Sequence, residues 1–181
     1  MITMLLAAMA FAPPAPIHCP VMGGTAKDSQ PFVLYKGVVY GFCCGGCVGG
    51  FESTPDKFIK AYQGESLLGF SAYDVVEMTV VDPKKAVAYS DYNKVRYYFL
   101  SKENKSKFDA NAKKFAAVPE NESFEAEGAL VHSKLTGYRD YNGTRYYFCC
   151  EGCLPNFQKD AAAFAKEHGS AKAKVYRIEL K

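Results

Sequence analysis

Two short cysteine-rich segments carry side chains that suit the binding of soft metal ions. The chain has 181 residues and seven cysteines, and six of these lie in two clusters of identical spacing. The clusters are Cys43, Cys44 and Cys47, and Cys149, Cys150 and Cys153. Thiolates are strong donors for Zn(II), Cu(I) and heavier ions. The six cysteines are therefore candidate metal ligands.

The spacing within a cluster suits ligands at the start of a helix. Cys43 and Cys47 are four positions apart and Cys44 and Cys47 three, so either pair projects onto one face of a helix. The dipole and free N–H groups of a helix N-terminus also lower the pKa of a thiol there. Gly45 and Gly46 lie between these cysteines and let the backbone approach an ion.

Each cluster needs a further ligand from a separate segment. For the first cluster this is Cys19, which begins a Cys-Pro-Val-Met-Gly turn in which Met22 adds a thioether and to which His18 is adjacent. No cysteine precedes the second cluster closely, and His132 is the candidate there, with Glu127 a weaker one. We expect a near-complete first site and a second site of mixed sulfur and nitrogen ligands.

Both clusters belong to a repeat that occurs three times. Its members are 35–42 with Phe51 and Phe58, 92–99 with Phe108 and Phe115, and 141–148 with Phe157 and Phe164. Apolar and polar residues alternate around an Asn/Lys/Gly turn, which predicts a β-hairpin, and the later phenylalanines have helical spacing. The middle copy has Leu100, Ser101 and Asn104 at the cysteine positions, so it keeps the scaffold without the thiols.

The first copy also shares residues around its cluster with a known family. These residues are the turn at 19–23, the segments 35–37 and 40–43, Cys47, Phe51 and the segment 55–58. On them, residues 18–62 resemble the YHS and TRASH domains, which are small treble-clef-like modules associated with copper and heavy-metal handling. The resemblance implies ligands at Cys19, Cys43 and Cys47, with Cys44 as an extra thiol. The third copy matches from 141 to 164, without the first cysteine.

The repeat and the resemblance together predict an α+β fold of tandem small treble-clef-like units, each with a knuckle, a β-hairpin and short helices, packed into one domain. The expected organisation is a signal peptide and linker at 1–16, a first unit with the metal site at 17–64, a degenerate second unit at 75–118, a third unit at 124–169 and a C-terminal strand at 172–181. A further strand is expected over 74–81, where it would pair in a shared sheet.

The N-terminal segment indicates export. Residues 2–12 are almost purely apolar, which is too short to span a bilayer, since that takes about 20 residues, but suits the core of a signal peptide. We therefore expect a periplasmic or extracellular protein without stable membrane insertion. The net charge of +3 is small and Lys and Arg are scattered, so no nucleic-acid partner is expected. No Ser-His-Asp set, carboxylate pair or phosphate loop is visible, which gives no reason to expect an enzyme.

Three functions remain open. The favoured one is a zinc- or copper(I)-binding protein for metal homeostasis, storage, delivery or sensing, with a metal transporter or another metalloprotein as partner. The second is a disulfide-stapled extracytoplasmic interaction module, because exported cysteines usually pair. The third is a thiol redox protein that uses the CxxC spacing at 44–47 and 150–153, although no βαβ pattern surrounds it. The middle copy, which loses all its cysteines together, favours metal binding.

Overall fold

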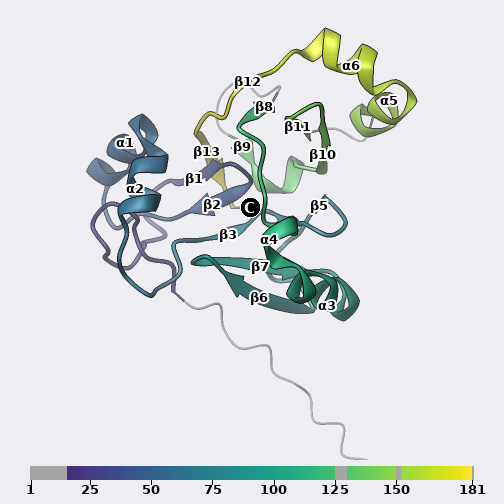
Figure 1. The fold of residues 1–181 in the computed structure, drawn as a ribbon. Helices are drawn as coiled ribbons and strands as arrows, with labels where there is room; N and C mark the ends of the chain where they lie inside the picture. Colours follow the sequence, from purple (N-terminus) through teal and green to yellow (C-terminus); the bar gives the residue numbers. More distant parts are fainter. Residues whose placement is uncertain (1–15, 125–129, 150–151, 181) are drawn as a thin grey trace, which may run out of the picture.

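The computed structural model describes residues 16–124, 130–149 and 152–180. Within these ranges the fold is α+β, as predicted, with short helices arranged around two mixed sheets (Figure 1). The predicted signal peptide, Glu127 and Cys150 lie outside the described residues. No helix in the described part of the chain is long and apolar enough to cross a membrane.

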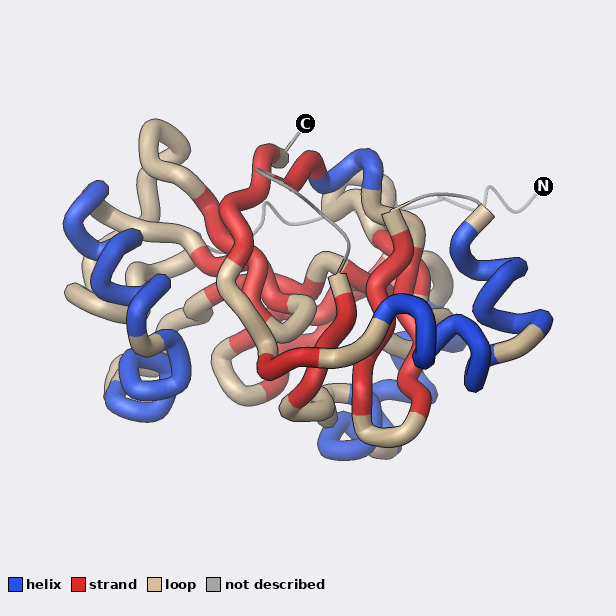
Figure 2. Tube along the Cα trace, turned by 90° about the horizontal axis from the view of Figure 1, so that it is seen from above, coloured by secondary structure: helices blue, strands red, loops and turns tan. Residues whose placement is uncertain are grey.

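The order hairpin, helix, helix recurs along the described chain, and we call its occurrences the first, second and third hairpin units. The first consists of β1 (Phe32–Tyr35), β2 (Val38–Tyr40), α1 (Gly45–Ser53) and α2 (Pro55–Ala61). The second consists of β6 (Ala88–Tyr92), β7 (Val95–Phe99), α3 (Lys102–Ala110) and α4 (Ala112–Phe115). The third consists of β10 (Gly137–Tyr141), β11 (Thr144–Phe148), α5 (Cys153–Lys159) and α6 (Ala161–His168). Figure 2 shows the strands in the middle and the helices around them.

The hairpins form where the sequence supplies residues that tolerate positive φ. The central turn residues with positive φ are Lys36 and Gly37, Asn93 and Lys94, and Asn142 and Gly143. Two consecutive residues of positive φ define the type I′ turn, whose twist matches that of the flanking strands. The turns that the sequence predicts are therefore the turns that close all of these hairpins.

Shorter elements join the hairpins into sheets. They are β3 (Gly69–Ser71), β4 (Tyr73–Asp74), β5 (Thr79–Val80), β8 (Asn121–Ser123), β9 (Leu130–Val131), the 3₁₀ turn η1 (His132–Lys134), β12 (Ala171–Lys172) and β13 (Tyr176–Glu179). One sheet has the order β6-β7-β3-β2-β1-β13-β9 and so contains the first and second hairpins. The other has the order β12-β8-β11-β10-β5-β4 and contains the third.

The prediction of a single strand over 74–81 is wrong. The segment forms β4 and β5 with a turn between them, in which the N–H of Met78 donates to the carbonyl oxygen of Asp74 (2.7 Å) and Met78 has φ +58°. The apolar alternation did not reveal this turn because a methionine at positive φ has no sequence signature. The expected C-terminal strand forms as β13, which pairs with β1 and β9.

Each hairpin packs its last phenylalanine against a phenylalanine of the helix that follows. The ring centroids are 5.3 Å apart for Phe42 and Phe51, 5.2 Å for Phe99 and Phe108, and 5.6 Å for Phe148 and Phe157. All these rings are buried, as predicted. Such aromatic pairs contribute roughly 0.5–1.5 kcal/mol beyond the burial of their area. The same contact therefore fixes the start of the helix beside the end of the hairpin in each unit.

Candidate metal centre

Three cysteines converge at the first hairpin unit, one from the turn before its hairpin and two from the region where α1 begins. The Sγ atoms of Cys19, Cys43 and Cys47 lie within 4.8 Å of one another, and Cys43 and Cys47 are 3.8 Å apart. Thiolates that share one tetrahedral Zn(II) lie about 3.8 Å apart, given Zn–S bonds of about 2.3 Å. Cys19 and Cys47 are buried and Cys43 is half-buried. The separation and burial of these sulfurs fit ligands of one ion.

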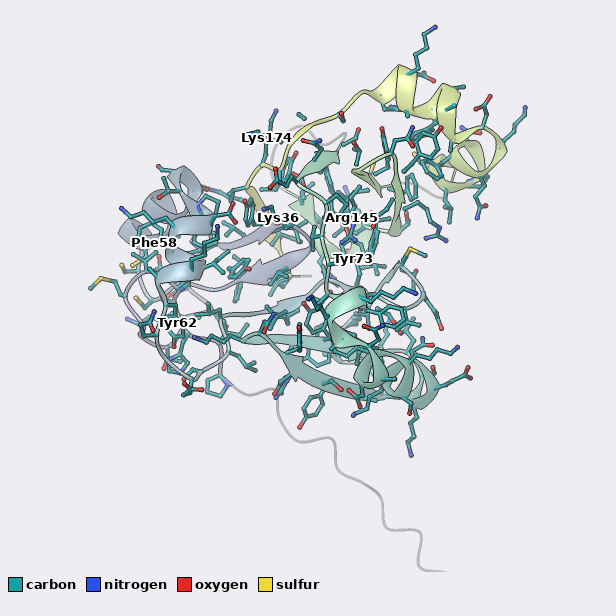
Figure 3. The ribbon with its side chains drawn as sticks, viewed as in Figure 1. Lys36, Phe58, Tyr62, Tyr73, Arg145 and Lys174 are labelled. Atoms are coloured by element: carbon teal, nitrogen blue, oxygen red, sulfur yellow. The ribbon has the colours of Figure 1, made fainter. Side chains whose placement is uncertain are left out.

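The turn that begins at Cys19 is a knuckle held by its own backbone. The N–H of Cys19 donates to the carbonyl oxygen of Gly24 and the N–H of Gly23 donates to that of Cys19, both at 2.8 Å. Gly23 has φ +73°, which favours glycine there. The knuckle thereby holds the Cys19 thiol against the start of α1. Phe58 of α2 and Tyr62, the residue after it, pack against the buried cluster that contains Cys19 and Cys47. Figure 3 shows these two rings beside sulfur atoms.

The electrostatics of Cys19 differ from those of the other two thiols. Burial raises the pKa of Cys19, but hydrogen bonds from backbone groups of Cys43, Met22 and Val21 outweigh it and the net shift is downward. Burial raises the pKa of Cys43 and, with contacts from neighbouring thiols, raises that of Cys47 well above its usual range. Several thiolates in one small space repel each other, and a bound cation removes this repulsion.

Cys44 lies next to this cluster and is exposed. Its Sγ atom is 3.0 Å from the Sγ atom of Cys47. The pKa of Cys44 is lowered, chiefly by hydrogen bonding to the Cys47 side chain and then by the backbone of Cys47. Met22 is 72% exposed, and His18 Nδ1 is 2.9 Å from the carbonyl oxygen of Gly23. Cys44 therefore contacts Cys47, but neither Cys44 nor His18 belongs to the group of three described residues whose ligand atoms all lie within 4.8 Å of one another.

The third unit places its predicted ligands in different environments. Cys149 is exposed, and Cys153 takes part in a disulfide bond. His132 is buried in η1, where its Nε2 atom has no hydrogen-bond partner within the part of the chain that the structure describes and burial lowers its pKa. Among the described residues, the group of cysteine, histidine and carboxylate side chains with ligand spacing is the one in the first unit, and it does not include His132.

In the second unit a hydrogen-bond network occupies the place of the thiols. Asp74 Oδ2 accepts from the N–H of Leu100 (2.9 Å) and from Asn104 Nδ2 (2.8 Å). Asn104 Nδ2 also donates to Glu77 Oε1 (2.7 Å). Leu100 and Asn104 align with Cys43 and Cys47, and both Asp74 and Asn104 are buried.

The sequence did not reveal Asp74 as the counterpart of Cys19. The backbone does: His18 pairs with Thr25 around the first knuckle, and Tyr73 pairs with Val80 around the second, which are the same positions shifted by 55 residues (73 − 18 and 80 − 25). Asp74 follows Tyr73 as Cys19 follows His18. The two knuckles are therefore equivalent, although one has a thiol and the other a carboxyl group.

The comparisons with known proteins point to the third unit. The YHS domain family matches residues 131–168, which span β9 to α6. No curated protein and no solved structure matches the chain. The YHS domain is associated with metal binding, and the thiol cluster of the first unit has the geometry to hold a metal ion. The match covers the unit without a knuckle cysteine, whereas the cluster lies in the first unit.

Proposed function

We propose that this chain is a metal-homeostasis protein that holds a soft ion at Cys19, Cys43 and Cys47 and that binds its ion rather than catalysing a reaction. The observation that carries the proposal is the convergence of three sulfurs within 4.8 Å from a knuckle and a helix start. Three thiolates at this separation are strong ligands for one soft ion. The ion accounts for their being kept together.

Copper(I) is the ion that this ligand set favours, with zinc as the alternative. Cu(I) is satisfied by two or three thiolates, whereas Zn(II) in a closed site takes four ligands. The cluster supplies three from the described residues, so Zn(II) needs a further ligand from solvent or from a partner. A site that is one ligand short of a closed zinc site suits an ion that is stored or handed to a transporter or another metalloprotein.

The three hairpin units are proposed to be tandem YHS-type copies, of which the second has lost its thiols. The carbonyl oxygens of Phe42, Phe99 and Phe148, at equivalent positions, each accept a backbone N–H from the segment before the hairpin, at 3.0, 2.9 and 2.9 Å. The shared turns and phenylalanine pairs support the same view.

Export to the periplasm or the exterior is part of the proposal. The apolar residues 2–12 motivate it, and the disulfide at Cys153 agrees with it, because disulfides persist in oxidising compartments.

The test is a titration of the fully reduced protein with Cu(I) and with Zn(II), each against a competing chelator. We expect the first unit to bind one equivalent, and Cys47→Ser to weaken that binding by at least about 100-fold, since loss of a mere supporting contact already costs 10–100-fold. Cys153→Ser is the matched control, since it alters the aligned position of the third unit, and it should leave the first site unchanged. The proposal fails if neither ion binds or if Cys47→Ser binds as tightly as the wild-type chain.

A further inference from the structure

The first unit has one thiol, that of Cys44, in addition to the cluster of three. Its side chain is exposed, while its Sγ atom lies 3.0 Å from that of the buried Cys47. Cys47 Sγ is also 3.8 Å from Cys43 Sγ and belongs to the cluster with Cys19. Cys47 therefore takes part in two arrangements, a cluster with Cys19 and Cys43 and a close pair with Cys44.

The close pair has the geometry of a dithiol that can be oxidised. A disulfide bond is about 2.05 Å long, so the two sulfurs need to approach by about 1 Å. Cys44 and Cys47 are separated by two glycines at the start of α1, which is the CxxC arrangement used in disulfide exchange. At the aligned position of the third unit, Cys153 is disulfide-bonded. The hairpin unit thus accommodates a disulfide at the position of Cys47.

We propose that Cys44 and Cys47 form a thiol–disulfide exchange site, with small or protein disulfides as its substrates, and that its oxidation opens the metal cluster. The gating of the ion rests on the proposed function, because it takes the cluster of Cys19, Cys43 and Cys47 as the ion site. The exchange itself requires only the pair of sulfurs.

The reaction has two steps. The Cys44 thiolate, which is the exposed one, attacks a disulfide R–S–S–R, so that a mixed disulfide forms at Cys44 and one R–S⁻ leaves. The Cys47 thiolate then attacks the sulfur of Cys44, the Cys44–Cys47 bond forms and the second R–S⁻ leaves. The two thiol protons end on the two departing thiolates, so that the dithiol is oxidised and R–S–S–R is reduced to two R–SH.

Oxidation and metal binding exclude each other at Cys47. A sulfur in a disulfide has no thiolate charge to give to an ion, and only thiolates serve as strong ligands. The oxidised unit would keep Cys19 and Cys43 alone. The ion is then released, and reduction of the disulfide restores the cluster.

The test uses the full chain loaded with Zn(II), an ion without redox chemistry of its own. Oxidised glutathione is added, the released Zn(II) is followed with a chromophoric chelator, and disulfides are mapped by mass spectrometry of peptides. In the wild-type chain we expect release to rise together with the Cys44–Cys47 disulfide. In Cys44→Ser we expect release to be at least about tenfold slower, because the accessible attacking thiol is gone.

Cys44→Ser should fold and bind Zn(II) in reducing buffer within about twofold of the wild type, because serine is a preferred residue at a helix start. The aligned Ser101 already has this role in the second unit, where its Oγ accepts from the N–H of Asn104. Cys149→Ser, which alters the exposed thiol of the third unit, is the matched control and should release Zn(II) as fast as the wild type.

The possible failures are distinct. Equal release from Cys44→Ser and the wild type, pairing of Cys44 with a different cysteine, or weaker Zn(II) binding by Cys44→Ser in reducing buffer would each overturn this inference, and the metal function would stand. If the Cys44–Cys47 disulfide forms but the reduced chain binds neither Zn(II) nor Cu(I), the exchange site is supported and the metal function is overturned.

Discussion

The knuckles that precede the first and second hairpins have the same backbone, but different side chains fill the site beside each of them. In each, an N–H four residues on donates to the carbonyl oxygen of the knuckle residue, from Gly23 to Cys19 at 2.8 Å and from Met78 to Asp74 at 2.7 Å. In the second, the N–H of Leu100 also donates to the knuckle side chain (2.9 Å), and in the first, hydrogen bonding from the backbone of Cys43 contributes to the lowered pKa of Cys19. The same backbone pairing thus carries a sulfur in one unit and a carboxyl group in the other.

What differs is how the rest of the site is filled. In the second unit Asn104 donates to both Asp74 and Glu77, so the buried polar groups satisfy each other. In the first unit the aligned Cys47 contacts two further thiols, which satisfy each other poorly as hydrogen-bonding groups. An ion bound in the first unit would therefore take the structural place that the amide of Asn104 has in the second.

The largest effect is expected when thiols are introduced into the second unit, which tests whether the two knuckles are equivalent. Asp74→Cys, Leu100→Cys and Asn104→Cys together place cysteines at the positions of Cys19, Cys43 and Cys47. Because the backbone is equivalent, the reduced triple variant should bind one equivalent of Cu(I) or Zn(II) beyond the wild type. Stoichiometry is measured by elemental analysis after gel filtration. A folded triple variant that binds no additional ion would show that the two knuckles are not equivalent.

Removing the carboxyl group should unfold the second unit more readily. Asp74→Ala leaves the N–H groups of Val76 and Leu100 without their acceptor and removes one of the hydrogen bonds of Asn104 Nδ2. The loss should cost about 3 kcal/mol, at roughly 1 kcal/mol for each hydrogen bond. The free energy of unfolding in urea measures it. Glu77→Ala is the control, because Glu77 accepts from the same Asn104 but is exposed, and it should lose less than half as much.

The two units also differ in how their first helix is capped, and the expected effect on stability is smaller. Ser101 caps α3 through its Oγ, whereas the Cys44 side chain makes no capping hydrogen bond to α1. Ser101→Ala should therefore lower the stability of the reduced, ion-free chain by about 1 kcal/mol. Cys44→Ala should change it by less than that. Equal losses in urea titrations of the two variants would refute the contrast.

A buried imidazole next to the second knuckle should make the stability of the chain depend on pH. Burial lowers the pKa of His132, against a smaller upward contribution from Asp82, so the unfolded chain takes up a proton at a higher pH than the folded one. Stability should therefore be constant above the ordinary histidine pKa of about 6.5 and fall below it, by at most about 1.4 kcal/mol per pH unit. Urea titrations of the ion-free chain between pH 7.5 and pH 5, values chosen to bracket about 6.5, test this.

His132→Leu serves as the control for that prediction. It removes the titrating group and should flatten the pH dependence relative to the wild type. If the wild type and the variant lose stability in parallel, the acid sensitivity belongs to other groups.

Local patterns predicted the hairpins and the helix starts because short-range chemistry decides both. The type I′ turns follow from Asn, Lys and Gly, and the cysteines of the first unit meet at a helix N-terminus as their spacing indicates. The knuckle of the second unit was missed because Asp74 lies 18 residues before Tyr92, whereas Cys19 lies 16 before Tyr35 (92 − 74 and 35 − 19). The shift breaks the register, and no cysteine marks the position.

The pairing between distant strands could not be predicted from the sequence, for a different reason. The short strand β3 pairs in antiparallel fashion with β2 and in parallel fashion with β7, and so joins two hairpins. A strand of three residues carries too little pattern to specify its neighbours. The assignment of hairpins to two sheets depends on such strands and became visible only in the structure.

The pairing of β1 with β13 has a consequence for how the protein is made. The strand that covers the outer edge of the first hairpin is Tyr176–Glu179, and its Arg177 forms an ion pair with Glu52, 125 positions away. During synthesis the first hairpin leaves the ribosome early, and its edge stays open until those late residues follow. An open strand edge can pair with another chain, and distant contacts form slowly. The nascent first unit therefore has a strand edge open to pairing with other chains until β13 has been made.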